Sequence, residues 1–236
     1  MHIASSPIPR YVVVADRLRK RIESGEWQAG HLLPSLHQLA ETFGVARLTA
    51  RQAVQILVRE GLLESRRGHG TVVTDLAVPL QTTPLETSLH ELGESYRSLV
   101  PRMLEFDDTP RTLPGVADSP ADYIYMRRLH SQNERPYCVI SLYIPQSVFA
   151  LDPDGFRTKA VIPVMLDNKS VRIARASQTL GIAAADAEVA SLLHIPAHAP
   201  VANVTRVFTA KDGTILYYAE VIYRGDAIRL EIDLKP

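Results

Sequence analysis

Four polar residues recur on one side of a helical pattern that spans residues 47–60. Arginine, glutamine and threonine side chains can hydrogen-bond to the edges of bases or to phosphates. The four residues are Arg47, Thr49, Arg51 and Gln52. Apolar residues at helical spacing predict the opposite, buried face of the same segment: Leu48, Ala53, Val54, Leu57 and Val58. We therefore expect a helix whose free face reads double-stranded DNA.

A basic turn follows this helix. Two strand patterns, residues 62–66 and 71–73, flank a short tip. The tip consists of Arg67, Gly68, His69 and Gly70. Its two glycines allow a sharp hairpin, and its Arg and His side chains suit contacts with the DNA backbone or a minor groove. The alternative interpretation is an ordinary helical hairpin followed by a surface β-hairpin.

Residues 35–43 predict the helix that must position this reading helix. Ser35 can cap its first turn, and Gln38 three residues later can complete a capping box. Gly44 is expected to end it, because glycine adopts the left-handed conformation found just past a helix end. A short helix, a tight turn, a helix with basic and amide groups and a basic hairpin together predict a winged helix-turn-helix.

Charge is unevenly distributed, although the formal net charge of the 236 residues is zero. Residues 1–75 contain ten Lys/Arg and seven Asp/Glu, a net +3, whereas residues 76–236 contain sixteen and nineteen, a net −3. The basic charge therefore lies with the helix-turn-helix.

The single cysteine, Cys138, leaves no intramolecular disulfide, and no apolar run approaches the roughly 18 residues of a membrane span. We expect a cytoplasmic protein without a membrane partner.

The region 33–73 closely resembles the DNA-binding head of the GntR family of bacterial transcription regulators. The shared pattern is L-P-S-x-x-x-L-A-x-x-F-G-V-x-R-x-T-x-R-Q-A-V-x-x-L-x-x-E-G-L-L-x-x-R-x-G-x-G-T. The resemblance implies operator binding, association with the nucleoid through that operator, and DNA contacts that include Ser35 and His37. His37 stands where the family usually has a phosphate-binding arginine. Ala46 replaces the usual Ser or Thr cap of the second helix, at a cost of about 1 kcal/mol to that helix end, so the operator is expected to differ from the family consensus.

The remaining N-terminal segments complete this domain. Residues 10–24 predict a helix, and Trp27 in the turn that follows is expected to pack in the small core, as in the corresponding family element. We expect a flexible tail over residues 1–9, the winged helix-turn-helix DNA-binding domain over 10–75 and a linker over 76–81.

Residues 82–236 predict an α+β domain. Strand patterns occur at 100–106, 123–130, 137–144, 171–180, 201–209 and 215–223, with a further candidate at 226–234. Short helices are expected at 89–93 and 185–193. Many strands with hairpin-type connections and few helices indicate an antiparallel sheet.

This second region resembles the UTRA domain of HutC-type GntR regulators, whose fold is similar to chorismate lyase. The shared patterns, over roughly residues 84–234, are R-x-[HR], P-x-x-x-x-x-x-Y-[IL]-P, A-x-x-L-x-I-P, V-x-R and Y-R-G-D. The resemblance implies that residues 82–236 form an effector-binding and dimerisation domain. It also implies a pocket for a small, usually anionic metabolite.

The resemblance places two groups of effector contacts. Thr87 and Ser88 begin a predicted helix, whose free N–H groups suit a phosphate or carboxylate. Arg128 and His130 are two residues apart on a strand, so they point to one face and can converge on one anion, with His130 supplying a weaker, pH-sensitive charge. The alternatives are a plain helix cap and an exposed sheet face whose charges are solvated.

Four further residues lie near family pocket positions: Tyr143, Tyr218, Glu220 and Tyr223. Tyr218 and Glu220 should share one face of a strand and Tyr223 the other, and each tyrosine could belong to the core or to the pocket. Ile140 occupies a position where sugar-phosphate-sensing members often have Glu. This replacement favours a more apolar acid as effector.

The leading hypothesis is a ligand-responsive transcriptional regulator, by family habit a repressor. Two heads of a homodimer would read the half-sites of a near-palindromic operator, under control of a small acidic metabolite, a carboxylate or a phosphate. The alternatives are a lyase-like enzyme domain fused to a DNA-binding head, and a constitutive DNA-binding dimer without an effector. No nucleophile–base constellation, phosphate loop or metal-ligand cluster is evident in the sequence. We therefore expect no enzymatic activity, catalytic residue, metal or cofactor.

Overall fold

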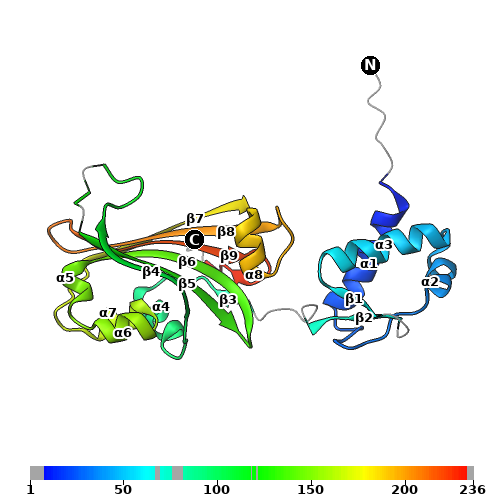
Figure 1. The fold of residues 1–236 in the computed structure, drawn as a ribbon, viewed down its shortest axis with the longest axis horizontal. Coiled ribbons are helices and arrows are strands. Elements are labelled where there is room, and N and C mark those ends of the chain that lie inside the picture. The colour runs from blue at the N-terminus through cyan, green and yellow to red at the C-terminus, as the bar shows by residue number, and fades with distance from the viewer. Residues whose placement is uncertain (1–7, 67–69, 76–81, 118, 121, 233–236) are drawn as a thin grey trace, which may run out of the picture. The chain divides into compact units, whose positions relative to one another are not determined.

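A computed structural model of the chain describes residues 8–66, 70–75, 82–117, 119–120 and 122–232 (Figure 1). The chain divides into two compact units, residues 1–79 and 80–236. The predicted linker, residues 76–81, lies outside the described residues, as do residues 1–7 of the predicted tail.

The N-terminal unit is a winged helix-turn-helix. Its elements are α1 (Arg10–Glu23), α2 (Leu36–Phe43), α3 (Arg47–Arg59), β1 (Leu63–Arg66) and β2 (Gly70–Val73). Leu18, Leu39 and Leu57, one from each helix, are almost completely buried in a shared core, which Leu63 of β1 joins. Trp27 is 6% exposed in the same core, as predicted from its place after the first helix.

The C-terminal unit is an α+β domain built on an antiparallel sheet, as predicted. Its strands are β3 (Thr83–Pro84), β4 (Arg102–Arg111), β5 (Tyr123–Gln132), β6 (Arg135–Pro145), β7 (Arg175–Ala184), β8 (Pro200–Thr209), β9 (Ile215–Arg224) and β10 (Ile228–Arg229). Its helices are α4 (Leu89–Tyr96), α5 (Gln146–Phe149), α6 (Pro153–Thr158), α7 (Val161–Asp167) and α8 (Ala187–Leu193). Six strands form the main sheet in the order β4-β5-β6-β9-β8-β7, while β3 and β10 form a separate parallel pair.

The two faces of the main sheet have different covers, because successive side chains of a strand point to opposite faces. We call inner the face that carries Met126, Val204 and Phe208. These residues pack with side chains of α4, α6 and α7 in the largest core of the unit. On the opposite, outer face, α8 packs through Val189 and Leu193 against residues that include Leu129 and Val139. Figure 1 shows the strands between these helices.

Several predicted bounds need correction. The strand expected at 171–180 begins four residues later, because Val171 and Ile173 pack against the inner core in an irregular segment instead of joining the ladder with β8. The candidate strand at 226–234 reduces to β10, since only Ile228 and Arg229 find backbone partners in β3 among the described residues. The three helices between residues 146 and 167 were not predicted. They are four to seven residues long, too short for a helical period to stand out.

Candidate DNA-binding surface and effector site

The predicted reading face lies on α3. Arg47, Arg51 and Gln52 are exposed, and Thr49 is half-buried. The residues that α3 buries are Ala50, Ala53, Val54 and Leu57. The prediction of Leu48 on the buried face was wrong, because this side chain is 66% exposed. Leu48 and Leu57 are nine residues apart, and a rotation of about 100° per residue places their side chains on opposite sides of the helix. Leu48 therefore lies beside Arg47 and Arg51 on the free face.

Local chemistry fixes both ends of α2. The Gln38 N–H donates to Ser35 Oγ at 3.3 Å, and the Ser35 N–H donates to Gln38 Oε1 at 2.9 Å, which completes the predicted capping box. Gly44 ends α2 in the left-handed conformation with φ 60°. Ala46 offers no side-chain cap to α3, as expected from its methyl group. His37 lies on the exposed side of α2, with Nε2 3.3 Å from Glu41 Oε1.

An ion pair joins α1 to the end of α3. Arg19 Nη2 lies 2.7 Å from Glu60 Oε1, and Arg19 Nε donates to Glu60 Oε2 at 3.1 Å. The hydrogen bond to Glu60 raises the pKa of Arg19 above its usual value. Both side chains are about a quarter exposed, at 27% each, so this pair helps to fix the angle of α3 without being a deeply buried charge.

The predicted wing is the β1–β2 hairpin. Leu63 pairs with Val73 and Arg66 with Gly70. Gly70 has φ +89°, a value that favours glycine. Arg66 is exposed and pairs with Glu64 at 3.1 Å. The remaining tip residues Arg67, Gly68 and His69 lie outside the described residues.

Arg128 and His130 lie on the inner face of β5, and both are buried, at 1% and 2% exposure. The alternative of an exposed, solvated sheet face is therefore wrong. Arg128 Nη1 donates to the Lys159 carbonyl at 2.5 Å, and Nη2 donates to the Phe156 carbonyl. Burial lowers the pKa of Arg128 to about 10. The guanidinium thus stays cationic at neutral pH and is held by the α6–α7 segment.

His130 is an uncharged imidazole at neutral pH. Burial, together with the nearby cations Arg128 and Arg206, lowers its pKa to about 3. Its ring lies edge-on to Tyr96, with ring centroids 5.5 Å apart. Within the described part of the chain, His130 Nδ1 and Arg128 Nε are buried without a hydrogen-bond partner. Such atoms are costly unless water or a ligand satisfies them.

A second buried cation, Arg206 on β8, lies on the same inner face and is 1% exposed. Its Nη1 donates to Tyr96 Oη at 3.0 Å, its Nη2 to Tyr223 Oη at 2.9 Å and its Nε to Gln178 Oε1 at 3.2 Å. The two tyrosine hydroxyls are 2.7 Å apart. Among the described residues no carboxylate pairs with Arg206, so its charge is balanced only by neutral oxygens.

Arg206 lines a cavity of about 100 Å³ at the start of α4. Thr87 and Ser88 lie on its wall, as does Gln178 of β7. Ser88 caps α4, because its Oγ accepts from the Glu91 N–H at 3.1 Å. Gln178 Nε2 donates to the Glu86 carbonyl at 2.6 Å, which ties the segment before α4 to the sheet. The structure therefore brings the predicted Thr87–Ser88 pair to a buried arginine.

The other predicted effector residues separate onto two faces. Tyr223 faces inward in the Arg206 network. Tyr218 and Glu220 share the outer face, where Tyr218 Oη donates to Glu220 Oε1 at 3.1 Å. Burial and then Glu220 raise the pKa of Tyr218 to about 12. Tyr143 stands opposite Tyr218 on the neighbouring strand, with ring centroids 5.9 Å apart. Tyr143, Tyr218 and Glu220 thus lie on the side of the sheet opposite the α4 cavity.

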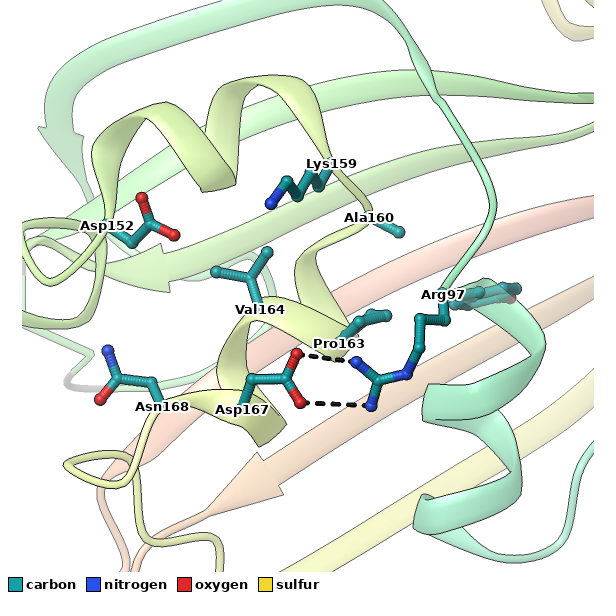
Figure 2. A pocket seen from close by; sticks show the side chains of 9 residues that line it. Arg97, Asp152, Lys159, Ala160, Pro163, Val164, Asp167 and Asn168 are labelled. Carbon is teal, nitrogen blue, oxygen red and sulfur yellow. Dashed lines mark hydrogen bonds and ion pairs between the residues drawn. The ribbon is translucent and has the colours of Figure 1, made fainter.

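A larger hollow of about 410 Å³ lies between α4, α6 and α7 (Figure 2). Its wall combines the cations Arg97 and Lys159 with the carboxylates Asp152 and Asp167. Arg97 Nη1 lies 2.7 Å from Asp167 Oδ2, and the same guanidinium pairs with Glu94. Figure 2 shows the Arg97 and Asp167 side chains facing each other with two contacts between them. This charge balance within the wall makes the hollow a poorer anion site than the α4 cavity.

Comparison with known proteins decides the family. Residues 10–73 match the model of bacterial regulatory proteins of the gntR family, and residues 118–229 match the UTRA domain. The chain is 30% identical over 226 residues to the HTH-type transcriptional repressor NagR of Bacillus subtilis (strain 168), covering 94% of this chain and 93% of NagR. The chain belongs to the GntR family. It is a DNA-binding transcriptional regulator with a UTRA effector-sensing domain.

Other relatives and solved structures agree with this membership. The Mannosyl-D-glycerate transport/metabolism system repressor MngR of Escherichia coli (strain K12) is 25% identical over 222 residues, covering 92% of each chain. The crystal structure of PhnF from Mycobacterium smegmatis superposes with a TM-score of 0.53 at 24% identity, covering 94% of this chain and 99% of PhnF. That likeness supports the fold alone. No helix among the described residues of this GntR regulator is long and apolar enough to cross a membrane.

Arg206, Gln178 and Tyr96 were missed as site residues. A signal for Arg206 was present, because an arginine interrupts the alternation of Val204 and Phe208 on a strand that otherwise reads as buried on that face. Nothing in the sequence indicates that Gln178 and Tyr96 meet it, since they lie 28 and 110 residues away along the chain.

Proposed function

We propose that this GntR regulator is a homodimeric repressor whose operator binding is loosened by a small organic acid bound in the α4 cavity. Repression is supported by the names of the relatives NagR and MngR, both of which are called repressors. Like the wider family, the regulator would act in the bacterial cytoplasm. Two α3 helices related by a twofold axis would read the two half-sites of the operator, with Arg47, Arg51 and Gln52 at base edges or phosphates.

The buried, unpaired charge of Arg206 is the observation that carries the effector proposal. A cation in the protein interior is unfavourable without an opposite charge, and neutral tyrosine hydroxyls supply only part of the compensation. The cavity beside Arg206 adjoins the first turn of α4, whose free N–H groups favour an anion. A carboxylate or phosphate placed there would receive hydrogen bonds from Arg206 and from the Thr87–Ser88 segment.

The size and lining of the cavity restrict the ligand class. A volume of about 100 Å³ has room for an acidic group beside Arg206. Leu89, Leu92 and Phe208 form the apolar part of the lining and offer no hydrogen-bond partner to a sugar hydroxyl. The proposal is therefore a small carboxylic acid with few hydroxyl groups. Arg128 Nε and His130 Nδ1 would be reached by a ligand only if α4 moved, because Tyr96 contacts His130.

Control of DNA binding requires that the acid bind one arrangement of the dimer more tightly than another. The response can be no larger than the difference between its free energies of binding to the DNA-competent and DNA-incompetent states. α4 is suited to report occupancy. It contributes Tyr96 to the Arg206 network, and its Gly93 lies so close to α7 that a Cβ there would be 2.4 Å from Leu166 Cδ1. Displacement of α4 would therefore be passed to α7.

The proposal is tested by ligand-induced release of DNA. Operator sequences would be selected from random DNA by the full chain, and release would be followed by fluorescence anisotropy during titration with individual carboxylic acids and phosphorylated metabolites. We expect at least one acid to release the wild-type chain, and the Arg206→Gln variant to bind DNA but not respond. The Arg102→Gln variant, which removes an exposed arginine on β4 of the same domain, serves as the control and should respond normally. An equal response of Arg206→Gln and wild type to the same acid would contradict the proposed site.

A further inference from the structure

Leu48 is an apolar residue on the free face of α3, and its side chain is 66% exposed. The other exposed residues of α3 are all arginine or glutamine: Arg47, Arg51, Gln52, Gln55 and Arg59. A single exposed leucine is ordinary on a protein surface. The position of Leu48, and not its exposure, therefore sets it apart.

Helical geometry places Leu48 at the centre of the free face. The residues that α3 buries are Ala50, Ala53, Val54 and Leu57. At about 100° per residue, Leu48 lies roughly 170° from the mean direction of these four residues. Arg47 and Arg51 lie closer to the edge of the free face on the same count. The Leu48 side chain therefore points directly away from the core of the DNA-binding domain.

Leu48 also lies in the first turn of α3. The N-terminal residues of a recognition helix are those that contact base edges when the helix lies in the major groove. Arg51 and Gln52 follow three and four residues later, so their Cβ atoms are about 5–6 Å from that of Leu48. The three side chains therefore face neighbouring base pairs.

The chemistry of the leucine side chain restricts what it can recognise there. Arginine pairs with guanine and glutamine with adenine, whereas the apolar group that the major groove offers is the C5-methyl group of thymine. Arginine and glutamine can also bind phosphates, which carry no sequence information. Leucine makes no hydrogen bond to a phosphate, so a contact of Leu48 with DNA reports the base alone.

We propose that Leu48 contacts the C5-methyl group of a thymine in each operator half-site, beside the base pair that Arg51 or Gln52 reads. The inference rests on the proposed docking of α3 and adds a specificity-determining residue with its chemical partner. Burial of one methyl group against leucine should contribute about fourfold in affinity per half-site. A protein partner suits this surface less well, because one leucine among arginines offers little apolar area and the arginines attract phosphates.

Replacement of thymine by uracil tests the contact in the full chain, because uracil lacks only the C5-methyl group. An operator would be selected from random DNA, and each thymine of a half-site, with its symmetry mate, would be replaced in turn. We expect one such replacement to raise the Kd of the wild type by about tenfold. Leu48→Ala should bind the unmodified operator about tenfold more weakly than the wild type and should be insensitive to that replacement.

Leu151→Ala is the matched control, because it truncates a leucine of the UTRA domain that is 44% exposed. It should keep the affinity of the wild type and its dependence on the methyl group. Alanine has a high helix propensity, so Leu48→Ala should also keep the Tm of the wild type. Its weaker binding would then reflect a lost contact and not a loss of folded protein.

Two results would overturn the proposal: a half-site in which no replacement weakens the wild type, or a Leu48→Ala variant that keeps the wild-type dependence on the methyl group. Loss of dimerisation in Leu48→Ala, with that dependence unchanged, would assign the leucine to a protein contact and overturn the proposal as well. If Arg47→Ala and Arg51→Ala weaken binding in the same assay, only the Leu48 contact falls and the proposed docking of α3 stands. Unchanged affinity of both arginine variants would overturn the docking itself.

Discussion

Arg206 on β8 donates a hydrogen bond from Nη2 to the hydroxyl of Tyr223 on β9, at a distance of 2.9 Å. Both side chains are almost completely buried. The same hydroxyl is 2.7 Å from that of Tyr96 on α4. One guanidinium thus joins two strands of the sheet to the helix whose first turn borders the cavity. This network makes the inner face a polar site within an otherwise apolar core.

Removal of the Tyr223 hydroxyl should be costly. Tyr223→Phe leaves Arg206 Nη2 and Tyr96 Oη each short of one partner in the interior, and an unsatisfied buried group costs about 1–3 kcal/mol. We expect urea unfolding to show a loss of that size. Tyr218→Phe is the matched control, because its hydroxyl bonds to the exposed Glu220 on the outer face and should cost less than about 1 kcal/mol. Equal losses in the two variants would argue against an energetically important network.

Acid should destabilise the UTRA domain through His130. The pKa of His130 is about 3 in the folded chain, against an ordinary value of 6.5. Between these pH values the unfolded chain binds a proton that the native chain does not. The free energy of unfolding should therefore be unaffected by this group above pH 6.5 and fall as the pH decreases toward 3, by at most about 1.4 kcal/mol per pH unit.

The His130→Gln variant isolates this contribution. Its free energy of unfolding, measured in urea at a series of pH values between 7.5 and 4, should fall less steeply than that of the wild type. His37→Gln, an exposed histidine on α2, is the control and should follow the wild-type curve. Parallel curves for His130→Gln and wild type would show that His130 is solvated or charged in the native state.

Substitution on the α3 face should weaken DNA binding without affecting assembly. Arg47→Ala and Arg51→Ala each remove an exposed cation from the reading face. We expect each to weaken binding of selected operator DNA by about 1–3 kcal/mol if it contacts a base. A phosphate contact would instead lower the salt dependence of binding by about one unit. Arg172→Ala, in the UTRA domain, is the control. Unchanged operator affinity in both α3 variants would rule out this docking mode.

Loss of the α2 cap should act on stability as well as on DNA. Ser35→Ala removes the acceptor for the Gln38 N–H and breaks the capping box, which should cost about 1 kcal/mol. Ser35→Asp keeps an acceptor at the cap and should retain stability, while the new negative charge near phosphates should still weaken DNA binding. Thermal unfolding of the two variants, paired with operator titrations, separates the structural role of Ser35 from the predicted DNA contact.

Local chemistry explains which features were predictable. Ser35, Gln38 and Gly44 act within a few residues of one another, so the capping box and the end of α2 could be read directly. Alternation along β5 and β9 likewise placed Arg128 with His130, and Tyr218 with Glu220, on common faces. These features depend only on the periodicity of one element.

Features that depend on distant contacts could not be read in this way. The Arg206 network draws on α4, β7 and β9, and no local pattern brings Tyr96 or Gln178 to it. The capture of Arg128 by carbonyls of residues 156 and 159 depends on helices that were themselves missed. Leu48 was placed inside by its apolar character, although helical geometry turns it toward solvent. The positive charge beside the cavity therefore results from contacts between residues that are distant in the sequence.

A thermal-shift screen of the full chain against small carboxylic acids and phosphorylated metabolites tests the central claim most directly. A compound that binds only the native state must raise Tm by mass action. The account predicts an acid that raises Tm of the wild type and of Arg102→Gln, which alters an exposed arginine on β4, but not of Arg206→Gln. The absence of any stabilising acid, or the same stabilisation of Arg206→Gln, would contradict an anion site at Arg206.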